Sequence, residues 1–345
     1  MSEKTKIQWC DDTNNFWRIC TKISPGCLNC YAVTATIVRI NKEEWGKGKP
    51  RIRSEAAFLK PYSWNKKPWV CDNCGKYHQT FANHNYQNTP LVDCICRNPH
   101  LAHAPELAHR RRVFSLSIGD WLDTESPIKN LADMMKVVLE CSSLNWLLVT
   151  KRPENFFSQL ESAQDWHFDQ GDRDIAGKLS DWRKHSIAPE NVWFGFTAEN
   201  QKCLDERWNH AKKIPAVQHF ISAEPMLQQM DFTRVIQEAK AFGFKLWFIF
   251  GGESGDNARR CNVEWIRKGV QQCSAAGFPV FVKQLGAFCT DTDFDADSLF
   301  RVWPGVDYEF NCAGVIYHLK HHKGGDIEEF PIDLRVRQFP SEPNQ

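Results

Sequence analysis

The stretch WRICTKISPGCLNCYA, residues 17–32, carries three cysteines within eleven consecutive positions. Cys20, Cys27 and Cys30 have the spacing C-x6-C-x2-C. Thiolates are soft, charged donors that suit zinc and iron–sulfur clusters. A structural zinc site takes four protein ligands, and Cys10 would complete such a set. A cubane [4Fe-4S] cluster bound by three cysteines instead leaves one iron open to a small ligand. The spacing alone does not decide between the zinc site and the iron–sulfur cluster.

A second group of cysteines lies between residues 60 and 112. It consists of two close pairs that are nineteen residues apart: Cys71, Cys74, Cys94 and Cys96. Paired knuckles of this kind are typical of a zinc ribbon, and three nearby histidines can replace one cysteine: His78, His84 and His100. Zn2+ would stabilise an insertion that is too small to bury a core of its own. Free thiols and a second iron–sulfur cluster are the alternatives.

The overall composition is that of an ordinary globular protein. The chain has 345 residues, of which 42% are hydrophobic and 25% are charged, and its formal net charge is +1. This charge gives the chain as a whole no attraction to nucleic acid, although basic runs occur at 47–53, 110–112 and 318–323. The polar start, MSEKTKIQW, and the lack of any apolar stretch of roughly 20 residues favour a cytoplasmic protein without membrane contact. In that reducing compartment, fourteen cysteines indicate metal ligands rather than disulfides.

Short apolar runs alternate with helix-length amphipathic segments from residue 112 onward. Six runs have the character of strands that are buried on both faces: 113–120, 145–152, 192–200, 219–225, 246–255 and 279–286. Helices are expected between them at 127–142, 201–213, 231–242 and 263–276. An earlier strand near 6–10 or 16–20 would lead into the cysteine loop, and a helix over 31–41 would follow it. Strands that alternate with helices predict an α/β fold with a parallel sheet.

Each run ends in polar or small residues, which favours a partial (β/α) barrel over an open, doubly wound sheet. The carboxyl ends of barrel strands meet at one mouth, whereas those of an open sheet spread along an edge. The candidates for cofactor and substrate binding at this mouth are Ser117, Asp120, Thr150, Lys151, Arg152, Thr197, Glu199, Ser222, Glu224, Gly251, Gly252, Glu253, Lys283 and Gln284. The competing interpretation is that they are ordinary loop polars and helix caps. No catalytic residue can be singled out among them.

Interruptions in the alternation of apolar runs and amphipathic segments predict four regions along the chain. Residues 1–59 would hold the first strand, the cluster loop and the first helix, and 60–112 would be a Cys- and His-rich, zinc-ribbon-like insertion. Residues 113–286 would complete the barrel, with a smaller insertion at 163–190, and 287–345 would form a β-rich cap. The sequence gives no indication of an oligomeric state.

A barrel with a three-cysteine loop after its first strand is typical of radical S-adenosylmethionine chemistry, and further motifs agree with it. The chain resembles the phage three-cysteine-motif family of radical-SAM-like proteins in IQWCDDTNNFWRICTKISPGCLNCYA, LLVTKRPEN, VWFGFTAEN, FISAEP, WFIFGGESG with Arg259, and FVKQLG. These motifs span most of residues 6–286. The resemblance implies a partial barrel of radical-SAM type, a [4Fe-4S] cluster on Cys20, Cys27 and Cys30, and S-adenosyl-L-methionine as a cofactor.

Two features depart from the common radical-SAM pattern. The first gap between cysteines is six residues instead of three, and Asn29 stands where an aromatic residue usually precedes the last cysteine. A Gly-Gly-Glu usually follows the second strand and holds the methionine amino group. Here it lies near the sixth run, at 251–253, so that Ser117 and Asp120 are alternative holders of the methionine end.

The phage setting of this family implies a particular reaction. An isomerase would convert an N-linked glycyl adduct of thymidine into its Cα-linked isomer during DNA hypermodification. Its partners would be modified DNA, with the base out of the stack, and an electron donor such as a flavodoxin or ferredoxin, in the host cytoplasm. The alternatives are another radical-SAM modification or repair reaction on a nucleic acid, and a non-catalytic, zinc-bound nucleic-acid-binding protein.

Overall fold

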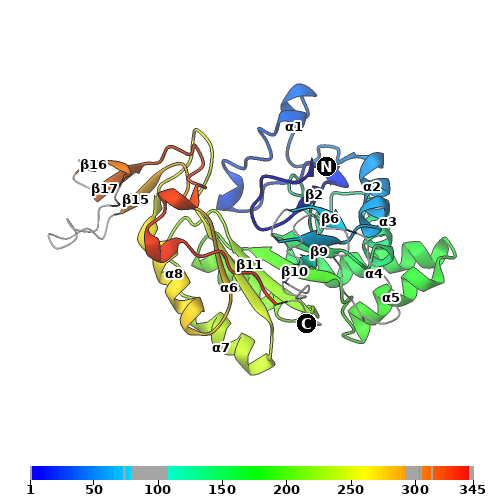
Figure 1. Cartoon of the computed structure of the whole chain (residues 1–345). Helices are drawn as coiled ribbons and strands as arrows, with labels where there is room; N and C mark the ends of the chain where they lie inside the picture. Colours follow the sequence, from blue (N-terminus) through cyan, green and yellow to red (C-terminus); the bar gives the residue numbers. More distant parts are fainter. Residues whose placement is uncertain are drawn as a thin grey trace, which may run out of the picture.

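The computed structural model describes residues 2–72, 75–78, 108–291, 303, 305–311 and 314–341. Its centre is an eight-stranded sheet with the order β1-β2-β8-β9-β10-β11-β12-β14. These strands are β1 (Ser2–Glu3), β2 (Asp12–Asn14), β8 (Arg112–Ser115), β9 (Asn145–Thr150), β10 (Val192–Thr197), β11 (Gln218–Ala223), β12 (Leu246–Gly251) and β14 (Val280–Gln284). All except the edge strand β1 run parallel and form a curled half-barrel (Figure 1). The predicted α/β fold with a partial (β/α) barrel is confirmed.

The first parallel strand is not where the sequence predicts it. All six apolar runs form strands of the sheet, but β2 lies between the two positions expected for the strand before the cysteines. Its residues, Asp-Thr-Asn, are polar and buried. The Asn14 side-chain amide donates to the Ala57 carbonyl at 2.9 Å, and Arg111 pairs with Asp12 at 2.5 Å. Buried polar partners therefore replace the apolar pattern on which the prediction depended.

Helices cover one face of the sheet. They are α3 (Ile128–Glu140), α4 (Phe156–Asp169), α5 (Arg173–Lys184), α6 (Gln201–Ala211), α7 (Thr233–Phe242) and α8 (Val263–Ala275). Apolar side chains from all six pack with outward-facing strand residues in one large core. The four predicted helices correspond to α3, α6, α7 and α8. The region 163–190 holds the end of α4 and all of α5, and these two helices pack together in the crossover from β9 to β10.

The opposite face of the sheet curls around Trp9. This indole contacts Phe114 on β8, Phe220 on β11 and Trp247 on β12, with ring centroids 4.6, 6.1 and 6.4 Å away. One side chain can reach three such distant strands only if the sheet is concave toward it. The same cluster includes Cys10, Leu147, Trp193, Ile249 and Phe281. The concave face thus has an aromatic floor.

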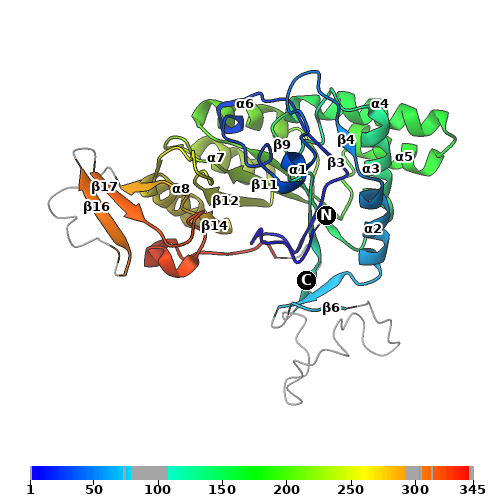
Figure 2. The ribbon, with the colours of Figure 1, turned by 90° about the horizontal axis from the view of Figure 1, so that it is seen from above.

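Short elements complete the described part of the chain. The helix expected over 31–41 is limited to α1 (Thr36–Ile40), which lies above the sheet in Figure 1, and α2 spans Glu55–Asn65. The small sheets consist of β3 (Trp17–Arg18) and β4 (Ile52–Arg53); β5 (Trp69–Cys71), β6 (Tyr77–His78) and β7 (Ala108–Arg110); and β13 (Cys261–Asn262), β15 (Cys289–Asp291), β16 (Asp307–Asn311) and β17 (Gly314–His318). Figure 2 shows β16 and β17 at one end of the molecule, away from β6. No helix among the described residues is long and apolar enough to cross a bilayer.

Candidate functional site

The cysteine loop starts just after β3 and is folded back by its own backbone. Ile19, before Cys20, has a φ of +80°, a conformation that is rare for a β-branched residue. Pro25 opens a single turn of 3-10 helix, Pro25–Cys27, in which the Cys27 N–H donates to the Ser24 carbonyl at 2.9 Å. These two bends bring cysteines that are separated in sequence to face the same space.

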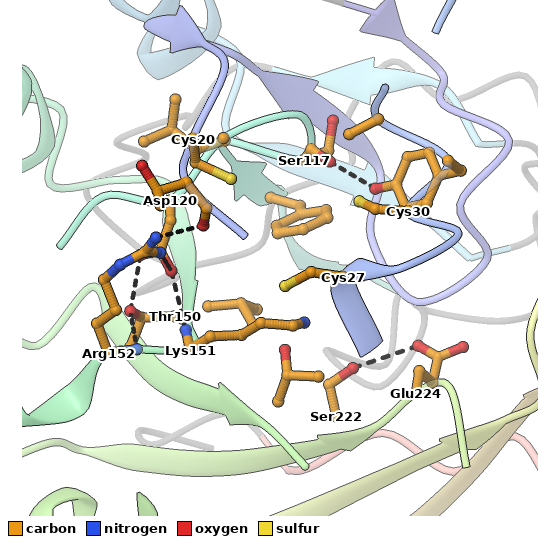
Figure 3. Close-up of a pocket in the computed structure, with 18 of the residues that line it drawn as sticks. Cys20, Cys27, Cys30, Ser117, Asp120, Thr150, Lys151, Arg152, Ser222 and Glu224 are labelled. Atoms are coloured by element: carbon orange, nitrogen blue, oxygen red, sulfur yellow. Dashed lines mark hydrogen bonds and ion pairs between the residues drawn. The ribbon is translucent and has the colours of Figure 1, made fainter. Parts of the chain in front are cut away.

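All three cysteines of this loop line one cavity at the mouth of the half-barrel (Figure 3). The cavity has a volume of about 150 Å³, and its floor includes Trp9 and Phe114. Cys10 does not line it, since its thiol lies in the aromatic floor, 3.7 Å from the Ile7 carbonyl. In the described ranges, no group of three Cys, His, Asp or Glu side chains is placed to hold a single metal ion. The three cysteines thus share one cavity, which Cys10 does not reach.

The three thiols differ in acidity because their surroundings differ. Burial raises the pKa of Cys20, and the nearby Asp120 carboxylate raises it further. Burial also raises the pKa of Cys30. For Cys27, burial is outweighed by the positive charge of Lys151 and by hydrogen bonds from the Ser24 region, which hold its pKa below the usual value. Cys27 is thus the thiol that forms a metal-binding thiolate most readily.

Asp120, Thr150 and Arg152 form one buried network at the ends of β8 and β9. Asp120 accepts from the Thr150 hydroxyl at 2.7 Å, from the Lys151 N–H at 3.0 Å and from the Arg152 guanidinium at 2.7 Å. The second arm of Arg152 donates to the Thr21 carbonyl at 2.6 Å. The network therefore ties the strand ends to the residue that follows Cys20.

Glu199 lies at the end of β10, and its side chain is fully buried. One carboxylate oxygen pairs with Arg207 of α6, which also donates to the Thr197 carbonyl at 2.6 Å. The other oxygen accepts from the Ser24 hydroxyl and, at 3.2 Å, from the Gly26 N–H. A Cβ on Gly26 would lie 2.8 Å from this oxygen, so the close approach needs glycine.

Glu253 follows β12 and is also paired with an arginine. One oxygen lies 2.5 Å from the Arg259 guanidinium, and the other accepts from Arg259 Nε at 2.9 Å and from the Asn29 amide at 3.1 Å. Gly251, two residues before Glu253, lies where close packing leaves no room for a side chain. A Cβ on Gly251 would lie 2.5 Å from Glu224 Oε1, so that Gly251 leaves room for the Glu224 carboxylate.

Further polar residues line the cavity beside Asp120, Thr150 and Arg152. Lys283 pairs with Glu224 at 3.1 Å, and the Ser222 hydroxyl donates to Glu224 at 3.3 Å. Lys151 extends into the space among these residues and the cysteines (Figure 3). A second cavity of about 100 Å³ shares five lining residues with the first and continues toward β12 and β14: Cys30, Tyr31, Lys151, Glu224 and Lys283. Gly252, Glu253 and Gln284 line that second part. The site is therefore an elongated cleft with two lysines and one carboxylate where its two parts meet.

A comparison with known protein families matches residues 4–326 to the family described as protein of unknown function, DUF5131. The chain belongs to the DUF5131 family. The match includes the cysteine loop and all seven parallel strands. No curated protein and no solved structure matches the chain significantly.

Two residues at the mouth of this DUF5131 protein escaped the sequence analysis. Tyr31, which follows Cys30, lines both parts of the cleft and donates its hydroxyl to the Ser117 carbonyl at 2.6 Å. Arg207 reaches Glu199 from α6, where a charged residue usually indicates the solvent face. The position of Tyr31 directly after Cys30 was a signal in the sequence, whereas nothing in the sequence pointed to Arg207.

The second cysteine group of the DUF5131 chain is described only at its start. Cys71 is buried at the end of β5, its N–H donates to the Lys76 carbonyl at 3.0 Å, and its carbonyl accepts from the Gly75 N–H at 2.8 Å. Gly75 has a φ of +61°. The other three cysteines lie outside the described residues: Cys74, Cys94 and Cys96. Zinc binding by this group stays a prediction.

Proposed function

We propose that this chain is a radical S-adenosylmethionine enzyme whose [4Fe-4S] cluster is bound by Cys20, Cys27 and Cys30. One observation carries the proposal: three cysteines of a single loop line one cavity at the carboxyl ends of a parallel half-barrel. Cysteines that bind one zinc ion converge on a point roughly 2.3 Å from each sulfur. An iron–sulfur cluster is instead held by several cysteine thiolates around it, and three thiols that line one cavity are compatible with such a cluster.

The side chains around this space have distinct tasks in the proposal. Cys27 supplies the most acidic thiol. Lys151 extends toward the cysteines from the end of β9 and would bind a carboxylate, such as that of S-adenosylmethionine. The Trp9 and Phe114 floor excludes water from one side of the site. When both are bound, cluster and S-adenosylmethionine supply a carbon radical that removes hydrogen from an unactivated C–H bond.

The substrate that we propose is an amino-acid-modified thymidine in DNA. The enzyme would convert an N-linked glycyl adduct into its Cα-linked isomer. The bond between nitrogen and the thymidinylmethyl carbon breaks, a bond from that carbon to the glycyl Cα forms, and one hydrogen moves from Cα to nitrogen. Atoms and electrons balance without a net oxidant. Support comes from the resemblance to a phage family and from two lysines and a carboxylate in the cleft, which suit an amino-acid group.

The proposed setting follows from this chemistry. A low-potential donor such as a flavodoxin or ferredoxin would reduce the cluster, and the reaction would take place in the cytoplasm of the phage host. A zinc-bound second cysteine group, including Cys71, would form a ribbon that helps to hold the DNA.

The proposal is tested on full-length protein purified without oxygen. Iron and sulfide are measured, dithionite and S-adenosylmethionine are added, and 5′-deoxyadenosine is assayed in the wild type and in Cys27→Ala. We expect about four irons per chain and a product that the variant does not form. Product analysis with candidate nucleosides then separates the isomerase from other radical-SAM reactions. Zinc alone, without deoxyadenosine from well-reconstituted protein, would instead leave a zinc-bound binding protein.

A further inference from the structure

We infer that three carboxylate–arginine pairs position the cluster loop, with one pair acting beside each cysteine. The pairs are Asp120–Arg152, Glu199–Arg207 and Glu253–Arg259. They come from the ends of β8 and β9, from β10 and α6, and from the segment after β12. The inference rests on the proposed function, since it assigns these residues to holding the cluster ligands and not to binding S-adenosylmethionine.

The loop needs such supports because its backbone joins no sheet. The backbone hydrogen bonds recorded for residues 20–35 in the described chain are all local, such as Leu28 N–H to Pro25 at 3.1 Å and Val33 N–H to Cys30 at 3.1 Å. Local turns define the shape of a loop but not its place over the sheet. That place depends on side chains that reach the loop from the strand ends.

The first pair holds the Cys20 side of the loop. Arg152 and Asp120 are each only 6% exposed, and the guanidinium donates to Asp120 at 2.7 Å and to the Thr21 carbonyl at 2.6 Å. The oxygens of Asp120 also accept from the Thr150 hydroxyl and the Lys151 N–H. With four donors around it, counting the Leu122 N–H at 3.1 Å, the carboxylate is saturated by the protein.

The second pair holds the Cys27 side most directly. Glu199 contacts the loop with its own carboxylate, through Ser24 and Gly26. Burial opposes ionisation of Glu199, but Lys151 and Arg207 outweigh it and hold its pKa below the usual value. The carboxylate therefore stays charged at neutral pH and keeps both loop contacts.

The third pair holds the Cys30 side. Glu253 accepts from the Asn29 amide at 3.1 Å, and the same amide donates to the Asn257 carbonyl at 2.7 Å. An aromatic residue at position 29 could not make these bonds. The two departures from the common radical-SAM pattern, Asn29 and the displaced Gly-Gly-Glu, are therefore linked by one hydrogen bond, from Asn29 to Glu253.

The decisive experiment compares Glu199→Ala with Glu199→Gln in full-length, anaerobically reconstituted protein. The rate at which a ferrous chelator removes iron and the electron paramagnetic resonance spectrum of the reduced cluster are recorded. We expect iron loss to be about 10- to 100-fold faster in Glu199→Ala, with a changed spectrum. Glu199→Gln keeps an oxygen that accepts from Ser24 and Gly26 but turns its NH2 group toward Arg207, so it should recover only part of the wild-type rate.

Glu238→Ala is the matched control. Glu238 accepts from Trp208 of α6 and from Lys212, which follows this helix, at 2.8 Å each, so its loss loosens the same helix without touching the loop. Its iron-release rate and spectrum should equal those of the wild type. Asn29→Ala is the second loop variant, because it removes a partly exposed side chain and leaves the core intact. It should also release iron faster.

The outcomes separate the inference from the proposed function. A wild-type protein that takes up no iron–sulfur cluster would overturn both. Suppose instead that the wild type binds about four irons, and that Glu199→Ala and Asn29→Ala release iron at the wild-type rate with an unchanged spectrum. The positioning role of the carboxylate–arginine pairs would then be refuted, and the enzyme proposal would stand. If Glu199→Ala does not fold, Asn29→Ala alone decides, with faster release supporting the inference and an unchanged rate refuting it.

Discussion

The two faces of the parallel sheet are built from the same strands but differ in chemistry. On the convex side, residues such as Phe194 and Phe248 pack with six helices in a continuous apolar core. On the concave side, an aromatic floor around Trp9 gives way at the mouth to charged residues such as Lys151 and Glu224. Alternation along each strand sends neighbouring residues to opposite faces. Variants on the convex face should therefore change stability, and those at the concave mouth should change binding.

The largest effect is expected from Cys27→Ala. It removes the most acidic of the three thiols, so bound iron should fall almost to zero. The free energy of unfolding of the metal-free protein should change by less than about 0.5 kcal/mol, because Cys27 belongs to neither of the two large apolar clusters. Iron analysis and thermal denaturation measure both quantities.

Cys141→Ala is the control for this variant, since Cys141 is buried in the convex core. It should keep its iron and lose stability. Full iron binding by Cys27→Ala would remove this cysteine from the ligand set.

Phe194→Ala should have the opposite effect. Phe194 is fully buried and packs edge-to-face with Trp121 and Phe156, at centroid distances of 6.2 and 6.0 Å. Its truncation should lower the free energy of unfolding by about 4 kcal/mol. Iron bound per folded chain should not change.

Chemical denaturation of the metal-free protein tests this prediction. Phe194→Leu keeps most of the volume and should cost only about 1 kcal/mol. Equal stability of the alanine variant and the wild type would contradict the assignment of stability to this face.

His219 makes the convex face sensitive to acid. It lies on β11 against Phe194 and Phe244, and burial lowers its pKa to about 4, although its Nε2–H donates to the Ile214 carbonyl at 2.9 Å. The unfolded chain binds a proton at this histidine near pH 6.5, the folded chain only near pH 4. Stability is therefore intact above pH 6.5 and decreases by about 3 kcal/mol as pH falls toward 4.

The acid dependence is measured by denaturation of the metal-free protein at several pH values. His219→Gln removes this titration while other groups keep theirs, so the difference between the two curves isolates it. If the free energies of unfolding of the wild type and of His219→Gln changed in parallel with pH, His219 would not be the group that causes the acid dependence.

Lys151→Met should have the smallest of these effects, confined to the concave mouth. Loss of one charged partner of a carboxylate should weaken binding of S-adenosylmethionine to the cluster-loaded protein about tenfold. Iron content at saturation should stay that of the wild type. Equilibrium dialysis measures the affinity, and Lys178→Met on α5 is a surface control. An unchanged affinity would leave Lys151 without this role.

The sequence predicted the sheet well where strands are apolar and poorly where they are polar. The runs from β8 to β14 are buried on both faces and stand out from their surroundings, whereas Asp12 and Asn14 are buried through hydrogen bonds and leave no periodic signal. Asp120 and Glu253 line the cleft, whereas Glu199 lines neither of its parts and contacts the cysteine loop at Ser24 and Gly26. Their partners could not be read from the sequence, because residue spacing does not say which loop atom a carboxylate will face.

The contacts of the cysteine loop also set an order of events during synthesis. Thr21, Ser24 and Asn29 meet partners that follow them by 131, 175 and 224 residues along the chain. A ribosome completes the loop long before it makes those partners, and contacts of such long range form late. The cysteine loop of the nascent chain therefore lacks these side-chain contacts until most of the half-barrel has been synthesised. If the proposed cluster is bound, its delivery therefore belongs at the end of folding, not at its beginning.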